Sequence, residues 1–137
     1  MKRDFPKNVS VISFYSSATR SDNGTNRVDY SKACESVFYV CAPDIDESGF
    51  DENGYTNETF LSEADDLADF VFSAVAEGRD IICQCDFGRS RSAACAAAIL
   101  EHFECRGDEI FSNNIYSPNA LVYKKVLEAL IRKENNK

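Results

Sequence analysis

The sequence predicts a single α/β domain over residues 1–137, with a central, mainly parallel sheet of about four strands flanked by helices. Short β-branched and aromatic runs alternate along the chain with longer segments of helical periodicity. One of these runs, residues 36–41, is apolar nearly throughout, as expected for a strand covered on both faces. The 137 residues suffice for one domain with a proper core.

Strands are predicted at residues 9–15 (VSVISFY), 36–41 (SVFYVC) and 80–84. A Ser/Thr/Asn/Gly-rich loop is expected at 16–26, followed by a short helix or turn at 28–33. Residues 42–57 contain three aspartates, two glutamates and two glycines, which indicates a long acidic loop. Long loops in compact domains are often functional, so this segment is a candidate part of a site.

Helical periodicity marks residues 59–77, where one apolar stripe is formed by Phe60, Ala64, Leu67, Val71 and Ala74. Gly78 is the expected C-cap of this helix. A second helix is predicted over 92–106, ended by Gly107, and 108–116 is predicted as a connection.

A last helix is predicted to open with Ser117 as N-cap and Pro118 at its first position. Its expected buried face consists of Leu121, Val122, Val126, Leu127, Leu130 and Ile131. The polar tail from Lys133 is expected to fray.

The net charge of −8 argues against general binding to nucleic acid or to anionic membranes, which require a basic face. No apolar run approaches the roughly 20 residues of a membrane span. The charged N-terminus has no long apolar region behind it, so we expect no secretory signal and a cytoplasmic location.

The six cysteines do not have the spacing of a zinc site, because Cys83 and Cys85 are too close and His102 has no histidine partner. Disulfides are rare where thiols are kept reduced. We therefore expect no metal and no cofactor, with most of the cysteines buried as small apolar residues.

The segment 81–92 (IICQCDFGRSRS) combines a strand, a tight polar loop and the start of a small-residue helix. This geometry binds oxyanions, because backbone N–H groups converge at the helix N-terminus. Two Cys-x₅-Arg frames fit, but the frame of Cys85 and Arg91 also places Gly88 in the loop and Ser92 at the helix start. Average residue usage would produce C-x₂-G-x₂-R-S by chance on the order of once in a thousand such chains.

The loop from Cys85 to Ser92 resembles the active-site loop of the cysteine-dependent protein tyrosine phosphatases, in particular the small dual-specificity type. The order of strand, acidic loop, helix and strand before it is similar, and so is the Ala-rich helix after it. The run YSPN at 116–119 further resembles small bacterial and phage members. The resemblance covers roughly residues 36–132.

The resemblance implies a phosphatase-type phosphate-binding loop between a strand and a helix. It further implies a monomer that hydrolyses phosphotyrosine in phosphorylated proteins or peptides. Phosphoserine and phosphothreonine are implied as further substrates. Cys85 is then the nucleophile that forms a cysteinyl-phosphate, Arg91 binds two phosphoryl oxygens, and Ser92 donates to the sulfur when it leaves. The loop that binds the phosphate through its backbone amides consists of Asp86, Phe87, Gly88, Arg89, Ser90 and Arg91. No metal is needed, since the arginine and the amides take its place.

The resemblance also implies a general acid on the acidic loop, and the candidates are Asp44, Asp46 and Asp51. Asp44 ranks first because it follows the strand 36–41 immediately, where the sheet still anchors the loop. Asp46 ranks second. The usual family spacing from Cys85 points nearer to Asp51, which ranks third because this loop is longer than most.

The chain departs from the family at Gln84, where the family usually has a histidine that can carry charge. This departure favours a second reading, a catalytically weak pseudophosphatase that binds phosphorylated partners. A third reading is a rhodanese-like or arsenate-reductase-like enzyme, against which Arg91 and Ser92 argue. Among the other thiols, Cys83 is expected to be a packed strand residue, and Cys41 and Cys95 are weak candidates for resolving thiols.

Overall fold

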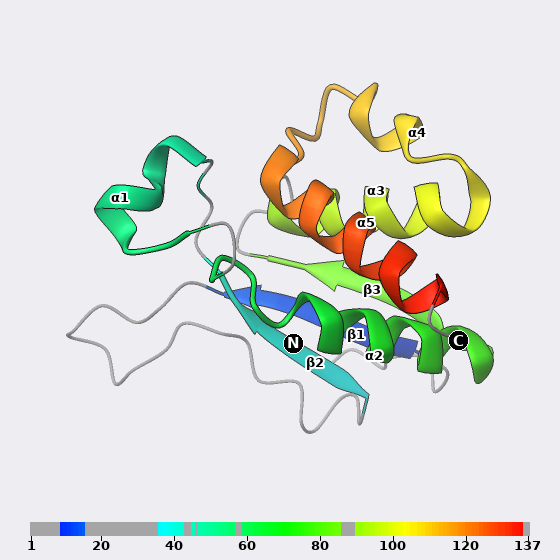
Figure 1. Cartoon of the computed structure of the whole chain (residues 1–137). Coiled ribbons are helices and arrows are strands. Elements are labelled where there is room, and N and C mark those ends of the chain that lie inside the picture. The colour runs from blue at the N-terminus through cyan, green and yellow to red at the C-terminus, as the bar shows by residue number, and fades with distance from the viewer. Residues whose placement is uncertain are drawn as a thin grey trace, which may run out of the picture.

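The computed structural model describes residues 9–15, 36–42, 45, 47–56, 59–85 and 90–135 (Figure 1). In chain order its elements are β1 (Val9–Tyr15), β2 (Val37–Cys41), the 3-10 helix η1 (Glu47–Gly49), α1 (Phe50–Asn53), α2 (Ala64–Ala76), β3 (Asp80–Gln84), α3 (Arg91–Glu104), α4 (Asp108–Phe111) and α5 (Ala120–Asn135). The predicted α/β class is confirmed.

Strand β1 lies in the middle of a three-stranded sheet of order β2-β1-β3 and pairs in parallel with both neighbours. In the ladders, Ser13 is opposite Gln84 and Tyr15 is opposite Cys41. The three predicted strand positions are confirmed to within one residue, but the described ranges contain no fourth strand. Because all three strands end at one edge, this edge is where an open parallel sheet places its ligand site.

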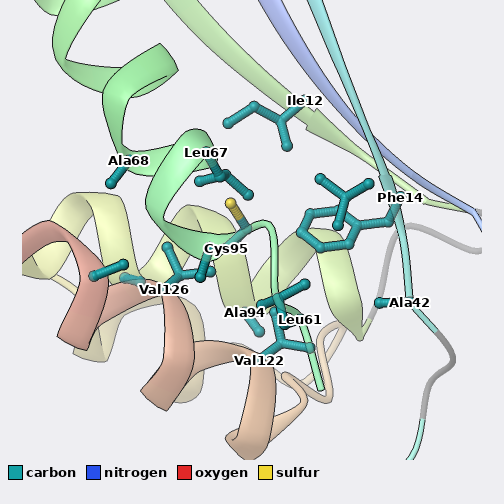
Figure 2. Close-up of a cluster of buried hydrophobic side chains, with 14 of the residues drawn as sticks. Ile12, Phe14, Ala42, Leu61, Leu67, Ala68, Ala94, Cys95, Val122 and Val126 are labelled. Carbon is teal, nitrogen blue, oxygen red and sulfur yellow. The ribbon is translucent and has the colours of Figure 1, made fainter. Parts of the chain in front are cut away.

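Helices α2, α3 and α5 cover the sheet face that carries Ile12 and Phe14 (Figures 1 and 2). One continuous core joins this face to all three helices. Its fully buried members include Ile12, Phe14, Val40, Leu67, Val71, Cys95, Val122, Val126 and Leu130. Each such aliphatic or aromatic side chain stabilises the fold by about 1.5–3 kcal/mol relative to exposure, so the core holds the strand ends and helix starts in place.

Helix α2 begins at Ala64, five residues later than predicted, because Leu61 adopts a left-handed backbone conformation with φ 54°. Phe60 and Leu61 are both buried, and neighbouring residues on a helix cannot point in the same direction. The turn therefore directs both side chains into the core. At the other end, the C-cap is Glu77 and not Gly78. Gly78 follows the cap in the left-handed conformation with φ 72°, and the N–H groups of Gly78 and Arg79 donate to Val75 O and Ala74 O.

The expected end of α3 at Gly107 is wrong, since the helix stops at Glu104 and Cys105 takes the left-handed position with φ 56°. Gly107 serves close packing instead: a Cβ there would lie 2.8 Å from Ala97 O, so only glycine lets the connection approach the helix. Helix α4 occupies part of the segment predicted as a connection.

The expected start of α5 is also wrong, because the N-cap is Asn119 and neither Ser117 nor Pro118. Asn119 Oδ1 accepts from the N–H groups of Leu121 and Val122 at 2.9 and 3.0 Å. An N-cap side chain satisfies backbone donors that have no partner inside the helix.

The predicted buried face of α5 holds for Leu121, Val122, Val126 and Leu130. Leu127 is half-buried, and Ile131 is exposed. Ala129 is fully buried although the prediction left it out. Ala129 lies seven positions after Val122, two helical turns further along the same face.

The predicted acidic loop contains two short helical segments, η1 and α1, after Ile45. Aromatic rings attach this segment to the core: the ring of buried Phe60 lies 5.8 Å from that of Phe50 and 5.6 Å from that of Tyr55. Tyr55 N–H also donates to Phe50 O at 3.0 Å. The segment that follows β2 is therefore held at two places, at the sheet and through Phe50 and Tyr55 at its C-terminal end.

Candidate active site

Cys85 follows the last residue of β3, and its thiol lies against the first turn of α3. The side chain is 5% exposed. Its Sγ donates to Ser92 Oγ at 3.1 Å, and the Ser92 backbone N–H donates to Sγ at 3.4 Å. N–H groups at a helix N-terminus favour negative charge, and the N–H of Ser92 is one such group. The structure thus brings Cys85 and Ser92 together.

Arg91 is the first residue of α3 and is 4% exposed. Its Nη1 donates to the carbonyl of Ala42 at 2.8 Å. Ala42 comes directly after β2, so this hydrogen bond joins the start of α3 to the start of the acidic segment. The bond holds the guanidinium at the same sheet edge as the Cys85 thiol.

Among the predicted phosphate-binding residues, Asp86, Phe87, Gly88 and Arg89 lie outside the described residues. Ser90 is described and stands just before α3. Its carbonyl accepts from Ala94 N–H at 2.9 Å and from Asn119 N–H at 3.1 Å. The start of α3 is therefore tied to the start of α5.

Gln84, which stands where the resembled family usually has a histidine, bridges β1 and the backbone of Cys85. Its Oε1 accepts from Ser13 Oγ at 2.8 Å, and its Nε2 donates to Cys85 O at 2.8 Å. The parallel register places Ser13 directly opposite Gln84, which makes this bridge possible. Gln84 therefore acts on the position of the Cys85 backbone.

Two candidates for the general acid, Asp44 and Asp46, lie outside the described residues, as does the side chain of Asp51, whose backbone lies in α1. Ile45, between the first two, is described and half-buried. Its carbonyl accepts from Asn119 Nδ2 at 3.0 Å. The segment that carries Asp44 and Asp46 is thus attached to the N-terminus of α5 at this residue.

Asn119 is the residue that the sequence interpretation missed. Its side chain caps α5 and binds Ile45 O, while its backbone N–H binds Ser90 O. One asparagine therefore connects the acidic segment, the start of α3 and α5. A capping preference for asparagine could have identified the cap, but no sequence signal predicts the bond to Ile45.

Within the described ranges, we find no helix with both the length and the apolar character required to cross a bilayer. No family model and no curated protein matches the chain.

Proposed function

We propose that this protein is a metal-independent phosphatase of the cysteine-dependent, dual-specificity type. It hydrolyses phosphotyrosine in proteins or peptides, with phosphoserine and phosphothreonine as further substrates. The proposal rests on one observation above all: Cys85 Sγ contacts Ser92 Oγ at 3.1 Å beside a buried Arg91, at the carboxyl edge of a parallel sheet.

The charges at this edge suit a phosphoryl group. A buried guanidinium interacts more strongly with an anion than an exposed one does, and a phosphate dianion is such an anion. The planar fork of arginine matches two phosphoryl oxygens, a geometry that lysine lacks. The Nη1 bond from Arg91 to Ala42 O orients this fork before substrate arrives.

In the first step, the Cys85 thiolate attacks phosphorus and the bond from phosphorus to the leaving oxygen breaks. The general acid, Asp44 in our ranking ahead of Asp46 and Asp51, gives its proton to the leaving phenolate. The products of this step are a free phenol, a cysteinyl-phosphate and an ionised aspartate.

In the second step, water attacks the cysteinyl-phosphate, and the ionised aspartate accepts the proton that water releases. The sulfur–phosphorus bond breaks, and the electron pair returns to Cys85 as a thiolate. The hydroxyl of Ser92, which already lies 3.1 Å from the sulfur, rotates to donate to that thiolate and lowers the barrier for its departure. Phosphate leaves, and the protonated acid is restored.

The test is hydrolysis of para-nitrophenyl phosphate with rapid mixing. A burst of nitrophenol equal to the enzyme concentration is expected, together with full activity in EDTA. Cys85→Ser should lose the burst and turnover while still binding inorganic phosphate. Cys105→Ser, which changes an exposed cysteine, is the matched control and should keep both.

Other outcomes would replace this proposal. Phosphopeptide binding without a burst from the wild-type chain would indicate the pseudophosphatase. Turnover of thiosulfate or arsenate in place of aryl phosphate would indicate the sulfur-transfer or arsenate-reducing class. We also propose a cytoplasmic location, because a reducing compartment keeps the nucleophilic thiol active.

A further inference from the structure

Strand β3 forms one edge of the sheet, because within the described ranges its only neighbouring strand is β1 (Figure 1). A strand at an edge presents unpaired N–H and C=O groups, to which another strand can be added. Asp80 at its start is the one charged residue of β3, and the strand contains no proline. Its middle residue, Ile82, is 39% exposed. This edge therefore lacks the charges and prolines that usually keep an exposed strand from pairing.

A groove of about 440 Å³ lies between β3 and helix α3. Ile81 and Cys83 line it from the strand and also pack against the core. Helix α3 lines it with apolar side chains spaced three and four residues apart, which lie on one face of a helix; they are Ala96, Ile99, Leu100 and Phe103. Phe103 is exposed, so the groove is open to solvent. We call β3 together with this stripe of α3 the β3 edge surface.

The charges of the β3 edge surface lie at one end of it. The groove is lined by Asp80 at the start of β3 and by Glu104 at the end of α3. Arg79 lies at the same end, but its guanidinium is paired with Glu77. At the other end the strand finishes with the uncharged Gln84. The surface is therefore acidic at one end, apolar in the middle and uncharged at the other end.

This distribution of charge matches a second copy of the chain turned end for end. A two-fold axis perpendicular to the sheet makes the two β3 strands antiparallel, so the acidic end of each copy meets the uncharged end of the other. A parallel arrangement would instead place Asp80 next to Asp80, and like charges opposite each other destabilise a strand pair. The two-fold arrangement is also the commonest among homo-oligomers.

We propose that a second copy of this chain occupies the β3 edge surface, in a two-fold dimer whose β3 strands pair antiparallel with Ile82 on the axis. In this register Asp80 is opposite Gln84 of the second copy, and Ile82 is opposite Ile82 of the second copy. The two sheets join into one continuous sheet. The two α3 helices then run antiparallel on the same face of that sheet, with their apolar stripes toward each other.

The dimer differs from the monomer that the family resemblance implies. It does not rest on the phosphatase proposal, because mass and cross-linking measure it without any substrate. Failure of one proposal therefore leaves the other in place.

The first experiment measures the mass of the full chain by sedimentation equilibrium in a reducing buffer, from micromolar to millimolar concentration. The mass should rise to twice that of one chain. Ile82→Lys places two lysines opposite each other at the axis and should raise the dissociation constant roughly tenfold or more. Ile131→Lys, which changes a residue of α5 that is 45% exposed, is the matched control and should dimerise like the wild type. Circular dichroism checks that both variants are folded.

The second experiment tests the register. Opposite residues of antiparallel strands have Cα atoms about 4.5–5.5 Å apart, which is within the range that a disulfide spans. Ile82→Cys, made together with Cys105→Ser to remove an exposed thiol, should therefore give a dimer linked through position 82 on mild oxidation, identified by peptide mass spectrometry. Ile131→Cys on the same background should give no such link.

Three results would each overturn the proposal. The first is a wild-type chain that stays monomeric over the whole concentration range. The second is an Ile82→Lys chain that dimerises as tightly as the wild type. The third is an Ile82→Cys chain that forms no link through position 82 on oxidation.

Discussion

The two sides of the candidate site are held by contacts that differ greatly in sequence separation. On the nucleophile side, Cys85 contacts Ser92, only seven residues further along the chain. On the side of the proposed general acid, Ala42 is bound by Arg91 over 49 residues, and Ile45 is bound by Asn119 over 74 residues. One strand end and one helix start are enough to position the proposed nucleophile, whereas the position of the segment that carries the proposed acids depends on tertiary contacts.

Arg91 belongs to both sides, so its replacement should affect catalysis more than any other substitution outside the nucleophile. Arg91→Lys keeps the charge but loses the planar fork and the geometry of the bond to Ala42 O. We expect kcat/KM for an aryl phosphate to fall roughly 10³-fold, measured by steady-state kinetics. Arg106→Lys changes an exposed guanidinium bound to Glu104 and Glu109 and should leave kcat/KM unchanged. Near-normal activity of Arg91→Lys would remove Arg91 from transition-state binding.

The acid side is tested by the three aspartates. Asp44→Asn should lower kcat by roughly 10²-fold for phenyl phosphate, a poor leaving group, and much less for para-nitrophenyl phosphate. The basic limb of the pH profile should also disappear, since that limb reports loss of the acid's proton. Asp46→Asn and Asp51→Asn serve as parallel variants. The one aspartate whose loss gives this dependence on the leaving group is the acid, and equal losses for both substrates would exclude Asp44.

The long-range contact at Asn119 can be removed without removing the helix cap. Asn119→Ser keeps an N-cap oxygen for α5 but loses the donor to Ile45 O. We expect kcat for phenyl phosphate to fall roughly tenfold because the acid segment shifts, while the melting temperature changes little. Asn119→Asp, which also keeps the cap, should behave alike. If Asn119→Ser retains the full rate for phenyl phosphate, the bond to Ile45 does not position the acid.

The smallest effect on rate is expected at Gln84, on the nucleophile side. Gln84→Leu removes the donor to Cys85 O and leaves the buried hydroxyl of Ser13 without its glutamine acceptor. This should lower the free energy of unfolding by about 1–3 kcal/mol, measured by urea denaturation, and should lower kcat/KM by less than tenfold. Gln84→His retains a donor and should recover most of the activity. A loss of kcat/KM as large as that of Arg91→Lys would mean that glutamine acts on the thiol itself.

The same contrast explains what could be predicted from the sequence. Strand positions 9–15 and 80–84 depend on local patterns, and the structure agrees with both. The contact of Ser92 with Cys85 was implied by the family resemblance, and the two side chains lie 3.1 Å apart with the thiol as donor. The caps at Asn119 and Cys105 were not predicted, because serine with proline and the nearby Gly107 are the more usual signals. The turn at Leu61 was not predicted, because it arises from tertiary packing that buries Phe60 and Leu61 together in the core.

The residue that joins the two sides could not be predicted, for a physical reason. Asn119 connects the two sides through its hydrogen bond to the carbonyl of Ile45, which lies 74 residues away in the sequence. No motif spacing or periodicity in the sequence predicts a contact of that separation. The hydrogen bond between Ser13 and Gln84 could not be predicted either, because it depends on the register that places these two residues opposite each other. The ranking of Asp44 above Asp46 and Asp51 as general acid stays a prediction, because the position of each carboxyl group depends on contacts between residues far apart in the sequence.

The central position of β1 has a consequence for how the chain folds as it is synthesised. The register joins Ser13 to Gln84 across 71 residues, whereas Ser10 reaches Ser36 across only 26. The first strand therefore leaves the ribosome long before one of its two partners exists. Strand pairing between residues far apart in the sequence slows folding. An apolar strand whose pairing partner has not yet been synthesised is prone to aggregate. Chaperones that bind extended apolar segments should therefore bind β1 while β3 is still being synthesised.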